Sequence, residues 1–192
     1  GFVGPNGSGK TTTVNMVTGL VSPTRGEVRF KGTRIDADLT AYRRHVGCVP
    51  EEPHLYPYLS GREHLELVAG LRQMDERTAA RRIDALLDLF GLGVYGDTSM
   101  SSYSKGMRQK VLIAAALLPD PPLIIFDEPL SGLDATSALV FRHLVSQLAA
   151  QGKAVLYSSH ALDTVEKICS RVLVLHQGLV VAHDEVGRLR ER

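Results

Sequence analysis

A glycine-rich stretch near the start of the chain constrains its fold more than any other feature. Residues 4–12 follow the pattern of Gly, four residues, Gly, Lys and then Ser or Thr, which is typical of loops that bind phosphate. Glycines let the backbone turn tightly, so that several N–H groups can point at one polyphosphate. Val14 and Val17 predict that a helix follows, and a helix N-terminus favours anions.

The residue types in this loop predict how it would bind phosphate. They favour this interpretation over a glycine-rich turn that binds no ligand. Lys10 can reach the β- and γ-phosphates, and the Thr11 hydroxyl can bind Mg²⁺. The expected phosphate-binding residues are Gly4, Pro5, Asn6, Gly7, Ser8, Gly9, Lys10, Thr11 and Thr12.

Length and composition narrow the class of protein. A chain of 192 residues fits one ordinary domain with a sizeable core. The net charge of +1 gives no strong basic field, so no nucleic-acid partner is expected. Cys48 and Cys169 lie among apolar residues without metal-ligand spacing, which predicts reduced thiols in a cytoplasmic protein. No apolar run is long enough to span a membrane and no signal peptide is visible, so membrane association would need a partner protein.

Strands alternate with helices along much of the chain. The run at 123–126 is continuously apolar, as in a strand buried on both faces. The alternation predicts an α/β fold with a mainly parallel sheet flanked by helices. The expected strands cover 26–31, 46–49, 123–126, 154–158, 171–176 and short segments near 178–183, and the expected helices cover 39–45, 134–150 and 161–168.

A block of helices separates the strand-rich segments. Ser60 and Glu63 match a capping box that starts one helix, and a second helix runs from about Asp75 to Gly91. A third helix begins after Ser104. We therefore expect a helical subdomain at about 52–118, inserted into a core made of residues 1–51 and 119–192.

An acidic pair follows directly on the buried strand. Asp127 and Glu128 would lie at the carboxyl end of a parallel strand, where such sheets bind ligands. With the phosphate loop present, Asp127 is expected to hold Mg²⁺ through water and Glu128 to polarise an attacking water. Without that loop, an acidic cap at a strand end would explain the pair equally well.

The start of the third helix carries the resemblance to a known family. Here the segment Tyr-Ser-Lys-Gly-Met at 103–107 precedes an apolar helix and the acidic strand. In this order the chain resembles the ATP-binding-cassette (ABC) ATPases, in which a Leu-Ser-Gly-Gly-Gln type signature binds the γ-phosphate of ATP held by the other subunit. Ser104 and Gly106 match that signature, whereas Tyr103, Lys105 and Met107 depart from it. Lys105 either adds a positive charge at the phosphate or faces solvent.

Three further segments occur in the order that this family shows. The segment 130–134 resembles the D-loop, which implies that Asp134 lies at a dimer interface near the attacking water. His160 ends a strand and resembles the switch histidine that contacts the γ-phosphate, although a lone histidine at a strand end is otherwise a core or surface residue. Glu51 occupies the position of the usual Q-loop glutamine, where a carboxylate can still meet Mg²⁺ but adds a negative charge.

The resemblance implies a P-loop NTPase with an inserted helical subdomain, which binds ATP and Mg²⁺ and hydrolyses ATP. Implied catalytic residues are Glu128 and His160; implied metal residues are Thr11, Asp127 and Glu51; Ser104 and Gly106 would act in trans. The implied partners are a second copy of the ATPase, as a homodimer or paired cassette, and transmembrane permease subunits. The expected location is cytoplasmic, at the inner face of the cell membrane through the permease.

The start of the chain departs from the family pattern. Only three residues precede the loop, no initiator methionine is present, and the aromatic residue that stacks on adenine in this family would lie further upstream. We therefore expect the sequence to be truncated at its N-terminus. The hypothesis that follows is that this chain alone binds ATP weakly and folds poorly.

Four functions compete at this stage. Glu51, the Ser-Lys-Gly-Met segment and the aromatic stretch 53–59 look similar to exporter ATPases of the ABC-2 type, and that stretch is either a docking patch for a permease helix or a locally packed loop. A soluble ABC ATPase acting on DNA or ribosomes would carry coiled-coil or zinc insertions, or two cassettes, and none is visible. A GTPase would need an Asn-Lys-x-Asp segment, which the chain does not contain. A regulatory module without hydrolysis fits poorly with Glu128 and His160.

Overall fold

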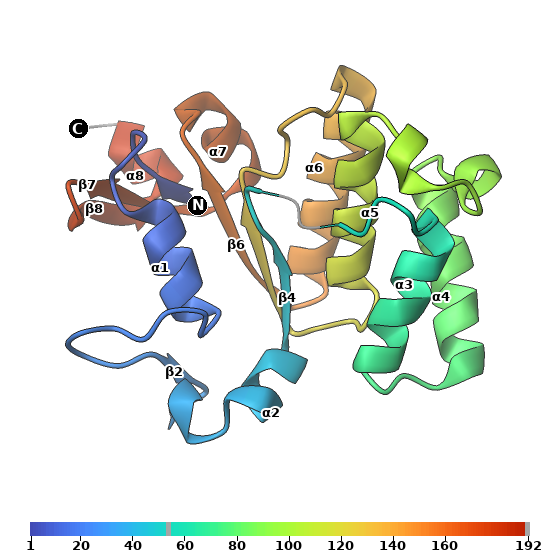
Figure 1. Cartoon of the computed structure of the whole chain (residues 1–192). Helices are drawn as coiled ribbons and strands as arrows, with labels where there is room; N and C mark the ends of the chain where they lie inside the picture. The colour runs from blue at the N-terminus through green and yellow to red at the C-terminus, as the bar shows by residue number, and fades with distance from the viewer. Residues whose placement is uncertain (53–54, 191–192) are drawn as a thin grey trace.

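A six-stranded sheet forms the centre of the molecule (Figure 1). A computed structural model describes residues 1–52 and 55–190. All neighbouring strands in the sheet pair in parallel except the last two, which form an antiparallel hairpin, so the expected mainly parallel α/β sheet is confirmed. Across the sheet the strands are β4 (Val46–Val49), β5 (Leu123–Asp127), β6 (Ala154–Ser159), β1 (Phe2–Val3), β7 (Arg171–His176) and β8 (Leu179–Glu185).

Helices cover both faces of this sheet around β5, an interior strand that is apolar on both sides. Ile125 belongs to a core cluster with Val14 of α1 (Lys10–Val17) and Tyr42 of α2 (Leu39–Arg44). Ile124 and Phe126 point the other way, into a larger core that contains residues of α6 (Ala135–Ala150) and α7 (Leu162–Ile168). Figure 1 shows α1 on one side of the strands, and α6 and α5 (Lys105–Leu117) on the other.

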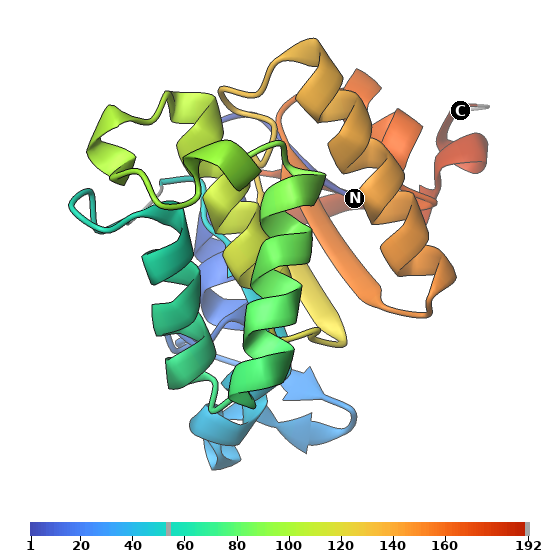
Figure 2. The same cartoon turned by 90° about the vertical axis from the view of Figure 1, so that its right-hand side faces the viewer.

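Three helices pack together next to α6, and one of them lies directly against strand β4. They are α3 (Gly61–Leu71), α4 (Glu76–Leu89) and α5 (Lys105–Leu117), and they lie side by side in Figures 1 and 2. The capping box of Ser60 and Glu63 is present at the start of α3, as expected, and the Asp75 carboxylate accepts from Thr78 N at the start of α4. The apolar core runs without a break from these helices to the sheet. The division into a core and a separate subdomain at 52–118 stays a prediction.

The segment expected as a strand at 26–31 is shorter in the structure. It contributes β2 (Arg29–Phe30), which pairs with β3 (Thr33–Arg34) in a two-stranded hairpin. The turn between them has left-handed φ angles of 49° at Lys31 and 83° at Gly32, so the chain reverses before a long strand can form. Three single 3₁₀ turns, at Ile35–Ala37, Gly93–Tyr95 and Met100–Ser102, and α8 (Val186–Arg190) complete the fold. Within the two described ranges every helix is too short or too polar to cross a membrane.

Candidate functional site

The phosphate loop connects β1 to α1, as the sequence predicted, and its glycines are required by the backbone. Gly7 and Gly9 have φ angles of 77° and 100°, which side chains disfavour. A Cβ on Gly4 would lie only 2.3 Å from the carbonyl oxygen of Leu175 on β7. The loop is therefore wrapped closely against the neighbouring strand at Gly4, where only glycine fits.

The Lys10 side chain lies across its own loop. Its Nζ donates to the carbonyl oxygens of Gly4, at 2.7 Å, and Pro5, at 3.2 Å, and the residue is only 7% exposed. These are acceptors that a phosphate oxygen can replace, and burial strengthens an ammonium–phosphate interaction. The loop thus places one buried cation at the helix N-terminus, where anions are favoured.

A cavity of about 300 Å³ opens above the loop. It joins the loop to the ends of β4 and β5, so it brings together segments that are far apart in the sequence. Its volume falls at the low end of the range for small-molecule sites. The lining residues are Asn6, Gly7, Gly9, Lys10, Thr11, Thr12, Glu51 and Glu128.

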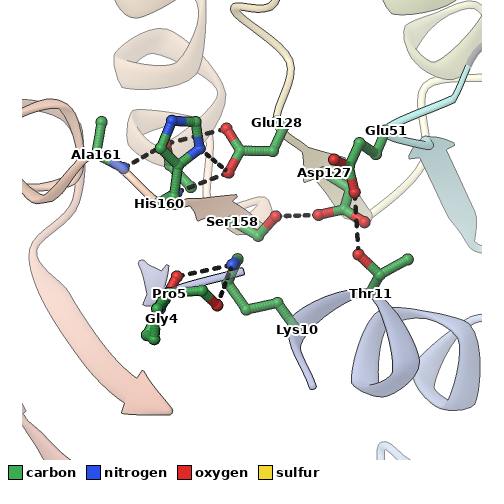
Figure 3. Close-up of polar contacts among 11 residues, drawn as sticks. Gly4, Pro5, Lys10, Thr11, Glu51, Asp127, Glu128, Ser158, His160 and Ala161 are labelled. Carbon is green, nitrogen blue, oxygen red and sulfur yellow. Dashed lines mark hydrogen bonds and ion pairs between the residues drawn. The ribbon is translucent and has the colours of Figure 1, made fainter. Parts of the chain in front are cut away.

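Thr11 and Glu51 meet at the edge of this cavity. The Thr11 hydroxyl donates to the Glu51 carboxylate at 3.2 Å (Figure 3). Hydroxyl and carboxylate oxygens are ligands that Mg²⁺ accepts in proteins, and Mg²⁺ is usually held by one or two carboxylates together with substrate phosphates. No group of three or more His, Cys, Asp or Glu residues in the described parts of the chain is arranged to hold a metal ion by itself. The donor set fits Mg²⁺ that arrives with a phosphate ligand.

The two carboxylates of the acidic pair take different partners (Figure 3). Asp127 is only 1% exposed, and its carboxylate accepts from the Ser158 hydroxyl. Glu128 lines the cavity and has a left-handed φ of 48°. Its carboxylate accepts from the backbone N–H of His160 at 2.6 Å and contacts the Nδ1 atom of the same histidine at 2.8 Å. The structure therefore brings Glu128 and His160 together, as two residues expected to act on one reaction.

Ser104, Gly106 and Asp134 lie outside the set of described residues that line the cavity. Ser104 and Asp134 cap helices α5 and α6, and hydrogen bonds from Ser137 hold the pKa of the Asp134 carboxyl below its usual range. Their segments contact each other, because a Cβ on Gly106 would lie 2.6 Å from the Gly132 carbonyl oxygen. These residues form a second, exposed cluster within the same chain.

Lys105 belongs to that second cluster. Its Nζ donates to the Ser131 hydroxyl at 2.9 Å, which joins the start of α5 to the loop before α6. The sequence left open whether this lysine faces a phosphate or solvent, and in the structure it binds a neighbouring loop of its own chain.

Sequence reasoning missed three residues that hold the acidic pair and the loop after it. Ser158 and Ser159 contact Asp127 and Glu128, and the buried Gln109 donates through Nε2 to the Pro129 carbonyl oxygen at 3.0 Å. The sequence does show that the strand expected at 154–158 ends in polar residues. Because this strand pairs in parallel with β5, its polar end lies beside the acidic end of β5. Nothing in the sequence points to the partner of Gln109.

Comparison with known proteins gives one consistent result. A family model described as "ABC transporter" matches residues 1–131. An ABC transporter ATP-binding protein of Nostoc sp. is 42% identical over 98% of this chain, and the chain spans 56% of that protein's length. The ABC transporter ATP-binding protein NatA of Bacillus subtilis is 35% identical over the whole chain, which spans 78% of NatA.

Two solved structures share the fold. One, described as the ATP-binding subunit of an ABC transporter, has a TM-score of 0.92 and 37% identity, with 99% of this chain and 79% of that chain covered. The other is described as a dimeric ATP-binding cassette in a post-hydrolysis state bound to ADP and Pi. It has a TM-score of 0.87 and 28% identity, with 96% and 84% coverage.

Proposed function

We propose that this chain, which belongs to the ABC transporter family of ATP-binding proteins, binds and hydrolyses ATP and thereby powers a membrane transporter. One observation carries the proposal. The buried Lys10, the glycine loop and the acidic Glu128 line a single cavity. The lysine and the glycine loop are the groups that bind a polyphosphate, and the carboxylate of Glu128 is a base that can assist its hydrolysis.

ATP binding would exchange partners at the loop. Lys10 would leave the carbonyl oxygens of Gly4 and Pro5 for the β- and γ-phosphates, while backbone N–H groups of the loop and the start of α1 face the phosphate oxygens. Thr11, Asp127 and Glu51 would hold Mg²⁺, which when bound neutralises part of the phosphate charge. Asp127 is buried, so it would act through a water molecule.

Glu128 and His160 would act on the γ-phosphate. Glu128 lines the cavity at the end of β5 and would polarise a water molecule there. His160 is paired with it, and 64% of the His160 side chain is exposed, so the ring can turn from Glu128 toward a phosphate without unpacking the core. The ring would then stabilise the charge that develops as the bond to the γ-phosphate breaks.

A second copy of the chain would complete the site. Ser104 and Asp134 are exposed and lie outside the cavity lining, so they can contact another molecule without refolding. In a two-fold dimer the same surface serves both copies, and Ser104 and Gly106 of one would close over the ATP of the other, with Asp134 at the interface. The solved cassette described as dimeric with ADP and Pi supports this arrangement.

The transporter partner would be a transmembrane permease, which places this chain in the cytoplasm at the inner face of the membrane. The aromatic stretch at 53–59 is the proposed docking patch; Pro53 and His54 lie outside the described residues. Tyr56 and Tyr58 are 50% and 72% exposed, and their rings lie 6.0 Å apart. Two exposed tyrosines on one loop offer an apolar surface to a helix of a partner. We assign the direction as export, because the sequence resembles ABC-2-type exporters.

Phosphate release from MgATP by the purified chain tests the proposal. Lys10→Met should slow release about 100-fold or more because a buried cation that faces the phosphates is lost. The exposed Lys167 on α7 supplies the matched control, and Lys167→Met should leave release unchanged. Equal rates for the Lys10→Met variant and the wild type would contradict the proposal.

A mass measurement tests the dimer separately. The chain has a mass of 20.9 kDa, and light scattering should report about twice that mass when MgATP is present and hydrolysis is blocked. Ser104→Ala should weaken this ATP-dependent dimer. A single-chain mass at saturating MgATP would rule out the shared site while leaving ATP binding itself intact.

A further inference from the structure

Two consecutive serines at the end of β6 contact the two acidic residues at the end of β5. Figure 3 shows the bond between Ser158 and Asp127. The strands are parallel and in register, with Asp127 directly across from Ser158. Neighbouring side chains on a strand point to opposite faces of the sheet. Ser158 and Ser159 therefore serve opposite faces, and each contacts one carboxylate.

Ser158 holds Asp127. Ser158 is 0% exposed and its hydroxyl donates to the Asp127 carboxylate. A buried carboxylate is costly unless it is hydrogen-bonded, and this bond also fixes the side-chain torsion of Asp127. The bond is made to the Oδ1 atom of the carboxylate.

Ser159 holds the other carboxylate. It is 4% exposed, and its hydroxyl donates to Glu128 Oε2 at 3.2 Å while accepting from the Ala161 N–H at 3.1 Å. The Ser159 hydroxyl therefore links the Ala161 N–H to the Glu128 carboxylate. His160 holds the opposite oxygen, Oε1. The two residues together fix the plane of the Glu128 carboxylate.

We infer that Ser158 and Ser159 are positioning residues with separate tasks. Ser158 orients Asp127 for binding of the metal–nucleotide complex, and Ser159 orients Glu128 for hydrolysis. The inference rests on the proposed ATPase function. It follows from the geometry because each serine reaches only one carboxylate, and those carboxylates have different roles in that function.

Kinetics and calorimetry separate the two tasks. Ser159→Ala should lower kcat about tenfold, because one bond to a charged group is lost, while the Kd for MgATP stays within about twofold. Ser159→Thr keeps the hydroxyl and should restore kcat. Ser158→Ala should instead weaken MgATP binding about tenfold relative to binding of metal-free ATP, measured by titration calorimetry. Ser146→Ala removes an exposed serine of α6 and should change none of these values.

Thermal unfolding controls for a general loss of structure. If Ser158→Ala does not fold, Ser158→Cys keeps a weaker donor of similar size and should show a smaller loss of the same kind. Two results would overturn this inference while leaving the proposed function in place, provided that the wild type is active. One is a Ser159→Ala variant with the wild-type kcat. The other is an equal loss of MgATP affinity in the Ser158→Ala and Ser159→Ala variants. A wild-type chain that binds no ATP would overturn the proposed function, and the inference with it.

Discussion

Replacing Glu128 by glutamine should separate binding from hydrolysis. The carboxylate has three contacts: Oε1 accepts from His160 N at 2.6 Å and meets Nδ1 at 2.8 Å, and Oε2 accepts from the Ser159 hydroxyl at 3.2 Å. A glutamine carbonyl can keep the contact with the His160 N–H, and its NH₂ group can donate to the Ser159 oxygen. The free energy of unfolding should therefore change by less than about 1 kcal/mol.

The same replacement removes the group that would polarise water. General-base catalysis is worth about 10²–10⁴ in rate, so turnover should fall by that factor while the affinity for MgATP is kept. Phosphate release at saturating MgATP and titration calorimetry measure the two quantities. Glu66→Gln, at an exposed position of α3, is the matched control. Turnover within about threefold of the wild type would refute the role of Glu128, and lost affinity would show that it binds nucleotide instead.

Three further predictions concern the loop, a thiol and the second cluster. Gly4→Ala should abolish ATP binding and lower the free energy of unfolding in urea by about 1–3 kcal/mol, because the new Cβ would lie 2.3 Å from a backbone oxygen. The control Gly70→Ala, on a helix with open space around it, should raise that free energy by about 0.5–1 kcal/mol. Equal effects of the two changes would contradict the loop geometry. Burial raises the pKa of the Cys48 thiol from 9.0 to about 12. The contribution of the neutral buried thiol to folding stability is therefore complete below pH 9, the pKa in the unfolded chain, and is lost as the pH rises toward the pKa in the folded chain. Iodoacetamide near pH 8 should alkylate Cys48 about 100-fold more slowly in the folded chain than in denaturant, and equal rates would refute the shift. Lys105→Ala should lower the free energy of unfolding by less than about 1 kcal/mol and leave the ATP-dependent dimer intact, because the lysine binds Ser131 of its own chain. If light scattering showed a dimer about tenfold weaker, Lys105 would instead contact the phosphate held by the partner.

Local sequence signals were enough for most of the elements. The starts of α3, α4, α5 and α6 were predicted because each has a capping side chain that bonds an N–H three residues further on, within the same short segment. The buried strand β5 was predicted because it is apolar on both faces. The phosphate loop is likewise a contiguous pattern, and six of its nine residues line one cavity, while their predicted role in binding ATP stays a prediction.

Contacts across the sheet could not be predicted in the same way. Glu128 and His160 are 32 positions apart, and the sequence alone gave each a role but not their hydrogen bonds. The task of Ser158 depends on the register of β6 against β5, which a sequence pattern does not fix. The short hairpin at 29–34 was missed because alternation suggests a strand while the left-handed turn at Lys31 and Gly32 cuts it short.

Titration calorimetry of the purified chain with MgATP shows whether the cavity above residues 4–12 binds the phosphates of ATP, with Lys10→Met measured beside the wild type. We expect the wild type to bind one ATP per chain and the variant to lose affinity at least 100-fold, about 2.7 kcal/mol. No heat of binding in the wild type, or equal affinity in both proteins, would contradict it.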